Sequence, residues 1–107
     1  MSKQISFEYE KKNYTLEYTV RTAAQANEDG FILEQLGEKP AAMIPKLVYW
    51  SFTKHQKWVT RKQAKEIYSW IKDKNGFITA LAEMYAEAVN ALIDDEDSEG
   101  NANWTMS

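Results

Sequence analysis

The sequence contains no cysteine and only one histidine, His55. A chain without cysteine has no disulfide framework, no thiolate nucleophile and no zinc ribbon. One imidazole cannot supply a metal site that needs two histidines from the same chain. No apolar run approaches the roughly 18 residues that span a bilayer, and the first residues lack the apolar stretch of a signal peptide. These absences favour a cytoplasmic domain with no membrane span and no cofactor.

The net charge is small, because 13 Lys and Arg are set against 16 Asp and Glu and leave −3. The distribution is uneven. Residues 1–93 carry 13 basic and 11 acidic groups, whereas residues 94–107 carry five acids and no base. A polar acidic run of this kind has nothing to bury. We therefore expect one folded domain over residues 1–94, followed by a disordered acidic tail over residues 95–107.

Apolar and polar residues alternate near the start of the chain, with the period of a half-buried strand. The alternation covers residues 5–10 and 14–20, and the polar residues 11–13 interrupt it. Two such runs joined by a short polar turn predict a β-hairpin. Asn13 is the expected turn residue with positive φ, and Glu17 belongs to the polar side. An isolated hairpin is marginal in water, so its aromatic side should pack on helices.

The remainder of the chain predicts about four helices. Thr22 is the expected N-cap of a short helix that reaches Asn27 and closes at Gly30. A helix that is apolar on nearly all sides then runs from Pro45 to about His55. A helix without a clear polar face is typical of the buried centre of a domain.

Two further helices complete the expected fold. Thr60 and Gln63 have the spacing of a capping box and begin a helix that stops at Gly76. The last helix runs from about Phe77 to Asp94, with apolar residues at three- and four-residue steps. The expected fold class is α+β but mainly α, with an N-terminal β-hairpin, about four helices and a disordered acidic C-terminal tail.

The sequence contains no complete catalytic motif. His55 lies in a lysine-rich stretch that is more typical of a solvated helix end than of a general base. Glu83 and Glu87 are one helical turn apart, but without a Glu-x-x-His motif they favour a solvated charge pair over a di-metal site. The four glycines are isolated, so no phosphate or dinucleotide loop is present. The sequence predicts no catalytic residue, no metal and no cofactor, and therefore no enzyme.

A basic stretch over residues 54–65 contains no acid and lies among aromatic residues. Such a pattern can hold a nucleic-acid backbone while bases stack on the rings. It is equally the pattern of a solvated connection between helices whose aromatics serve the core. The charge of residues 1–93 is far below the basic footprint of nucleic-acid-binding domains. Nucleic-acid binding is therefore only an alternative.

Aromatic residues are abundant, with four Trp and six Tyr in 107 residues. Surplus aromatics supply large contact area at interfaces, and basic residues beside them can steer an acidic partner. The tryptophan of the acidic tail is either part of a segment that orders on contact with a partner or a neutral terminal residue. The candidate partner-binding residues are Trp50, Lys57, Trp58, Arg61, Lys65, Trp70 and Trp104.

The whole pattern is similar to a known family. A hairpin leads to Asp29-Gly30-Phe31-Ile32, and a central apolar helix and a basic connection follow. The final helix contains the sequence Leu-Ala-Glu-Met-Tyr-Ala-Glu at residues 81–87, and the acidic end contains Asn103-Trp104. This arrangement resembles the tail assembly chaperones encoded among the tail genes of siphophages and prophages of Gram-positive bacteria. The resemblance covers nearly the whole chain and lies in apolar spacing.

The resemblance implies a non-catalytic, mainly helical protein that forms homo-oligomers in the host cell cytoplasm. Its partners would be the tape measure protein, whose apolar helices it keeps soluble, and the tail-tube protein that assembles around them. A longer form made by a frameshift is also expected in this family. Two alternatives remain, namely a minor phage structural protein, such as a connector or tail completion factor, and a small nucleic-acid-binding domain that uses residues 54–65.

Overall fold

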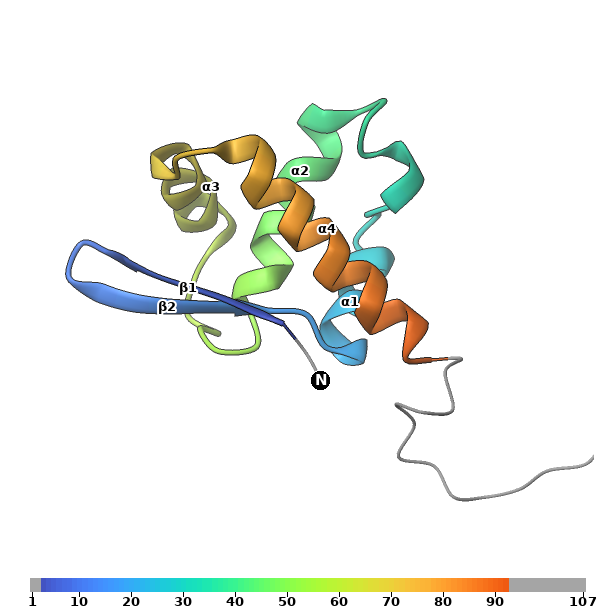
Figure 1. The fold of residues 1–107 in the computed structure, drawn as a ribbon, viewed down its shortest axis with the longest axis horizontal. Helices are drawn as coiled ribbons and strands as arrows, with labels where there is room; N and C mark the ends of the chain where they lie inside the picture. Colours follow the sequence, from blue (N-terminus) through green and yellow to red (C-terminus); the bar gives the residue numbers. More distant parts are fainter. Residues whose placement is uncertain (1–2, 93–107) are drawn as a thin grey trace, which may run out of the picture.

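The computed structural model describes residues 3–92 as a β-hairpin followed by helices (Figure 1). This order confirms the predicted α+β, mainly α fold. The predicted tail at residues 95–107 lies outside the described residues. Over residues 3–92, no helix is long and apolar enough to cross a membrane. The elements are β1 (Gln4–Tyr9), β2 (Lys12–Glu17), α1 (Val20–Glu28), the 3-10 turn η1 (Leu33–Gln35), α2 (Pro40–Phe52), α3 (Arg61–Trp70) and α4 (Lys74–Asn90).

The hairpin is tighter than the sequence predicts. Its strands pair antiparallel from Gln4 opposite Glu17 to Tyr9 opposite Lys12. The turn is the dipeptide Glu10-Lys11, with φ values of 49° and 66°. Two positive φ values are the geometry of the two-residue turn that matches strand twist. The expectation of a turn at residues 11–13 was therefore wrong, because the shorter turn leaves Asn13 inside β2 as the partner of Glu8.

Helix α1 begins earlier than expected. Thr19 rather than Thr22 is the N-cap, and its hydroxyl accepts a hydrogen bond from the Thr22 backbone N–H at 3.2 Å. The contact is reciprocal, because the Thr22 hydroxyl accepts a hydrogen bond from the Thr19 backbone N–H at 2.9 Å. Thr22 thus occupies the third helical position of a capping box in which threonine replaces the usual glutamate. At the other end, Gly30 has φ 103° and ends the helix as predicted.

The start of α2 also differs from the expectation at Pro45. Pro40 occupies the first turn, where a missing N–H leaves no helical hydrogen bond unmade. Pro45 lies inside the helix and deprives the Ala41 carbonyl of its donor. Ala41 is exposed, so water can satisfy that carbonyl. The helix therefore continues through a proline that the sequence pattern placed at its beginning.

N-terminal caps determine where helices α3 and α4 begin. Thr60 and Gln63 form the predicted capping box of α3. Gly76 does not stop that helix but lies in the first turn of α4, whose N-cap is Asp73. The Asp73 carboxylate accepts from the Gly76 N–H at 3.1 Å. A Cβ on Gly76 would collide with that carboxylate, so glycine serves the cap and the expected start at Phe77 was too late.

The core lies where α2 passes behind α4 (Figure 1). Leu47 and Phe52 of α2 and Leu81 of α4 are fully buried, which confirms α2 as the buried centre of the domain. Tyr18, after β2, donates its hydroxyl to the Leu47 carbonyl at 2.6 Å. Burial raises the pKa of the Tyr18 hydroxyl well above its usual value. The hairpin is thereby fixed to the helices by a buried polar contact as well as by apolar packing.

Candidate protein-binding surface

Five aromatic rings form a continuous line across the inner side of the hairpin, which we call the aromatic row. Trp70 contacts Tyr9 and Phe7, with ring centroids 5.1 and 6.4 Å apart. Phe7 stacks on Tyr14 at 5.6 Å, and Tyr14 meets Trp58 at 5.8 Å. The row therefore runs from Trp70 beside β1 to Trp58 beside β2.

Local structure explains why these rings meet. Residues 7 and 9 lie on the same side of β1, because side chains alternate along a strand, and Tyr14 is the cross-strand partner of Phe7. Trp70 is the last residue of α3, and Trp58 belongs to the connection between α2 and α3. The hairpin thus presents three aromatic side chains, and the α3 region adds one indole at each side.

The two indoles remain largely in water. Trp58 is 53% exposed and Trp70 is 54% exposed, whereas Tyr14 between them is buried. The Lys12 ammonium lies 4.9 Å from the Trp58 ring, a cation–π contact. Burial is the largest of the effects that raise the pKa of the Tyr9 hydroxyl. The surface is apolar and aromatic, with a cation at its β2 end.

Trp50 and Arg61 lie in a separate cluster and are already engaged. The Trp50 indole N–H and the Arg61 guanidinium both donate to Asp29 Oδ2, at 3.0 and 2.8 Å. Arg61 also lies 4.4 Å over the Tyr49 ring. Burial raises the pKa of Asp29, but the hydrogen bonds from Arg61 and Trp50, together with the charges of Arg61 and Lys46, outweigh it and hold this pKa below its usual value. This cluster ties α3 to α1 and α2.

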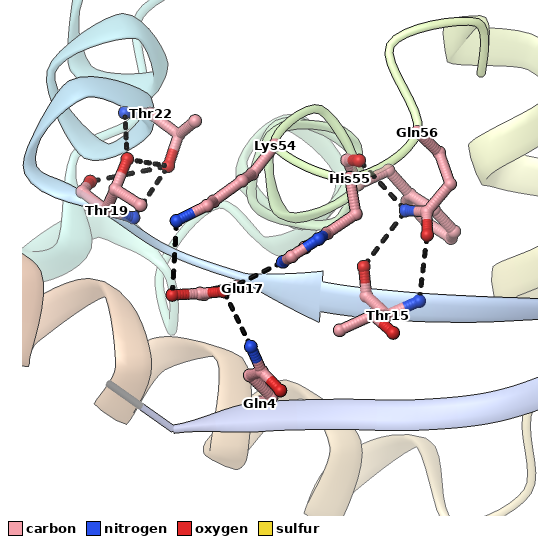
Figure 2. Close-up of polar contacts among 9 residues, drawn as sticks. Gln4, Thr15, Glu17, Thr19, Thr22, Lys54, His55 and Gln56 are labelled. Atoms are coloured by element: carbon pink, nitrogen blue, oxygen red, sulfur yellow. Dashed lines mark hydrogen bonds and ion pairs between the residues drawn. The ribbon is translucent and has the colours of Figure 1, made fainter. Parts of the chain in front are cut away.

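A polar network lies on the outer side of the hairpin, at the end where Gln4 pairs with Glu17 (Figure 2). Glu17 is buried, with its carboxylate 2.9 Å from Gln4 Nε2 and 2.8 Å from His55 Nε2. Lys54 lies 3.6 Å away. The expectation that Glu17 faces water was wrong, because the connection after α2 folds over it and places His55 and Lys54 beside its carboxylate. His55 thereby has a structural partner.

A second network joins the start of the chain to α4. The Lys3 ammonium lies 3.1 Å from Glu87 and 3.8 Å from Glu83. The hydrogen bond and charge of Glu87, together with the charge of Glu83, raise the pKa of Lys3. All three groups are solvated, so the expected carboxylate pair faces a lysine at the surface. Among residues 3–92, no cluster of three His, Cys, Asp or Glu side chains could hold a metal ion.

An apolar groove lies between α4 and the segment formed by η1 and the start of α2. It has a volume of about 510 Å³ and is lined by residues of η1, α2 and α4. Leu33, Leu36 and Ile44 form one wall, and Ile78 and Ala82 form the other. Among the lining residues that the structure describes, Glu83 alone carries a titratable group, and the groove otherwise offers apolar contact.

The structure thus divides the candidate residues. Trp58 and Trp70 join one surface, whereas Trp50 and Arg61 belong to the Asp29 cluster. Lys57 and Lys65 are exposed, and Trp104 lies outside the described residues. The sequence analysis missed the contribution of Phe7, Tyr9 and Tyr14, although their alternation already placed them on one side of the hairpin.

Comparison with known proteins identifies a family for this aromatic, hairpin-first domain. The whole chain, residues 1–107, matches the family described as "Domain of unknown function (DUF5055)". The chain belongs to the DUF5055 family. No curated protein and no solved structure matches it.

Proposed function

We propose that this DUF5055 domain is a non-catalytic adaptor that binds other proteins through the aromatic row. The observation that carries the proposal is the pair of half-exposed indoles, Trp58 and Trp70, of which Trp58 contacts the buried Tyr14 and Trp70 contacts the partly buried Phe7 and Tyr9. Tryptophan and tyrosine dominate the binding energy of many protein interfaces, because they bury large area with little loss of rotamer freedom. Their positions are fixed by the hairpin, so binding needs little ordering of the surface.

The chemistry of the row indicates the kind of client. Its rings offer apolar contact, and Lys12 places a cation 4.9 Å from the Trp58 ring at the β2 end. Such a surface suits an apolar segment of a partner whose flanks carry acidic residues, since surrounding charges steer the encounter. An amphipathic helix of a long, helix-rich protein has this character.

The resemblance to tail assembly chaperones supplies the specific client. Under this proposal the domain acts in the cytoplasm of a phage-infected host, binds the tape measure protein during tail morphogenesis, and passes it to the tail-tube protein. The apolar helices of the tape measure protein would occupy the aromatic row and stay soluble. Catalysis has no part in this activity.

Retention of the tape measure protein encoded in the same genome tests the proposal. The wild-type chain, immobilised at low salt, should retain it, and the W58S/W70S double variant should lose most of that retention. Ile32→Ser is the matched control, because Ile32 is also an exposed apolar residue, at 40%, but lies outside the row. Equal retention by the double variant, or none by the wild type, would overturn the proposal.

Two further measurements separate the alternatives. A minor structural protein would be found by mass spectrometry in purified particles, where a chaperone is absent. A nucleic-acid-binding domain would give a mobility shift that weakens steeply as salt rises. Either result, combined with no retention of the tape measure protein, would replace the chaperone proposal.

A further inference from the structure

The two edges of the hairpin differ in the structure. The outer edge of β2 is covered by Gln56, whose side-chain amide donates to the Thr15 carbonyl and accepts from the Thr15 N–H, both at 2.9 Å. Figure 2 shows this amide on the side of β2 away from β1. One side chain therefore occupies the place of a neighbouring strand at this edge.

The hairpin register fixes which groups of β1 point outward. A two-residue turn makes Tyr9 and Lys12 a hydrogen-bonded pair, and such pairs alternate with non-hydrogen-bonded pairs along an antiparallel ladder. Ser6 and Thr15 are therefore a non-hydrogen-bonded pair, and both point their N–H and C=O away from the hairpin. The Gln56 contact with Thr15 agrees with this phase.

By the same alternation, Gln4, Ser6 and Glu8 present their backbone groups along the outer edge of β1. Among the described residues, no backbone group outside the hairpin bonds to Ser6 or Glu8. Gln4, Ser6 and Glu8 are themselves exposed. An unpaired strand edge is a template for a further strand.

We propose that the open edge of β1 pairs antiparallel with β1 of a second copy of this chain, in a register centred on Ser6. This interface is separate from the client-binding proposal and does not depend on it. In this register Ser6 faces Ser6 of the partner, Gln4 faces Glu8, and Ile5 faces Phe7. The result is a four-stranded antiparallel sheet about a twofold axis.

The side chains of β1 suit this register. Gln4 opposite Glu8 places an amide donor beside a carboxylate on the exposed side, so the pair attracts. Ile5 and Phe7 meet as a non-hydrogen-bonded pair, where cross-strand side chains are closest. They then extend the apolar side of the sheet. A register centred on Phe7 would also bring outward-pointing groups together, but within β1 it forms two hydrogen-bonded pairs, Ser6 with Glu8 and Glu8 with Ser6, instead of three.

Cross-linking provides a test that depends on register. Because the chain has no cysteine, Ser6→Cys introduces a single thiol. In the proposed register the two Cα atoms at position 6 lie about 5.5 Å apart, within the disulfide range of roughly 4.4–6.8 Å. Oxidised glutathione should convert this variant to a covalent dimer on a non-reducing gel.

Glu8→Cys is the matched control on the same edge. Position 8 faces position 4 of the partner, so its two copies lie roughly 13 Å apart along the strands and cannot be bridged. Efficient cross-linking of S6C with little of E8C supports the proposal. Equal cross-linking of both variants, or none of S6C, overturns it.

Ser6→Pro provides a second, non-covalent test by sedimentation equilibrium. Proline is tolerated on an edge strand where its missing N–H faces solvent, so the hairpin should keep its circular dichroism spectrum. The variant removes a hydrogen-bond donor at the centre of the interface in both copies. Its dimer dissociation constant should rise at least about tenfold, while Ser6→Thr, which keeps the N–H, should not change it. A wild-type chain that stays monomeric, even if S6P lowers client retention, would overturn pairing with a second copy and assign the edge to the client.

Discussion

Two groups of aromatic residues in this domain have opposite relations to water. Tyr18, Phe31 and Tyr85 pack edge to face deep between the helices, with Phe31 only 4.8 Å from Tyr85 by ring centroid. The aromatic row uses the same residue classes and similar ring spacings, but its end members Trp58 and Trp70 are more than half exposed. Similar local geometry therefore occurs in one group that is sealed and in one that is open.

Ring–ring contacts alone therefore do not distinguish a buried core from an exposed interface. The buried group has no further apolar area to bury, so its energy is already part of folding. The row retains exposed indole area that a partner can still cover. Under the proposed function, folding and binding therefore rest on different aromatic groups of one small domain.

Truncating one member of each group should give the largest contrast. Phe31→Ala removes a fully buried ring and should lower the free energy of unfolding by about 3–5 kcal/mol. Trp70→Ala removes a half-exposed ring at the end of the row and should cost about 1–2 kcal/mol, because less area returns to water. Urea unfolding followed by circular dichroism measures both losses. Equal losses of unfolding free energy would contradict the distinction between the buried group and the aromatic row.

Removing one tyrosine hydroxyl from each aromatic group should change the free energy of unfolding less than removing a whole ring. Tyr18→Phe deletes the donor to the Leu47 carbonyl and should cost about 1 kcal/mol. Tyr14→Phe is the control in the row, since no hydrogen bond of its hydroxyl is present among the described residues. Its unfolding free energy should stay within about 0.5 kcal/mol of the wild type. A larger loss for Y14F than for Y18F would contradict the assignment.

The Asp29 cluster should give the smallest effect, and one that depends on pH. Its lowered pKa means that folding is stabilised by the ionised carboxylate above the unfolded value of 3.8. This stabilisation is lost as pH falls through the folded pKa. The difference in unfolding free energy between wild type and Asp29→Asn should therefore be constant above about pH 5 and shrink in more acidic solution. A difference independent of pH would show that Arg61 and Trp50 do not favour the ionised carboxylate.

Local signals predicted much of the fold. The alternation of apolar residues identified both strands, and the spacing of Thr60 and Gln63 identified the start of α3. Gly30 ended α1 as expected. Each of these features depends on residues within a few positions of one another, where side-chain and backbone preferences act directly.

The misses at Glu17 and at the aromatic row arose where distant segments decide, whereas the errors at the turn and at the helix ends were local. Glu17 reads as a solvent-facing residue until His55 and Lys54 are folded over it. The turn at Glu10-Lys11 contains no glycine or asparagine, so turn preferences could not place it. No sequence signal near Trp70 predicts its contact with Tyr9. The aromatic row forms only when α3 packs beside the hairpin.

The central claim is that the row binds a client while the buried group maintains the fold. Calorimetric titration of the tape measure protein into wild type and the W58A/W70A variant tests it most directly, at a temperature where both are folded. We predict that the variant binds at least about tenfold more weakly. An unchanged affinity in a folded variant would contradict the claim.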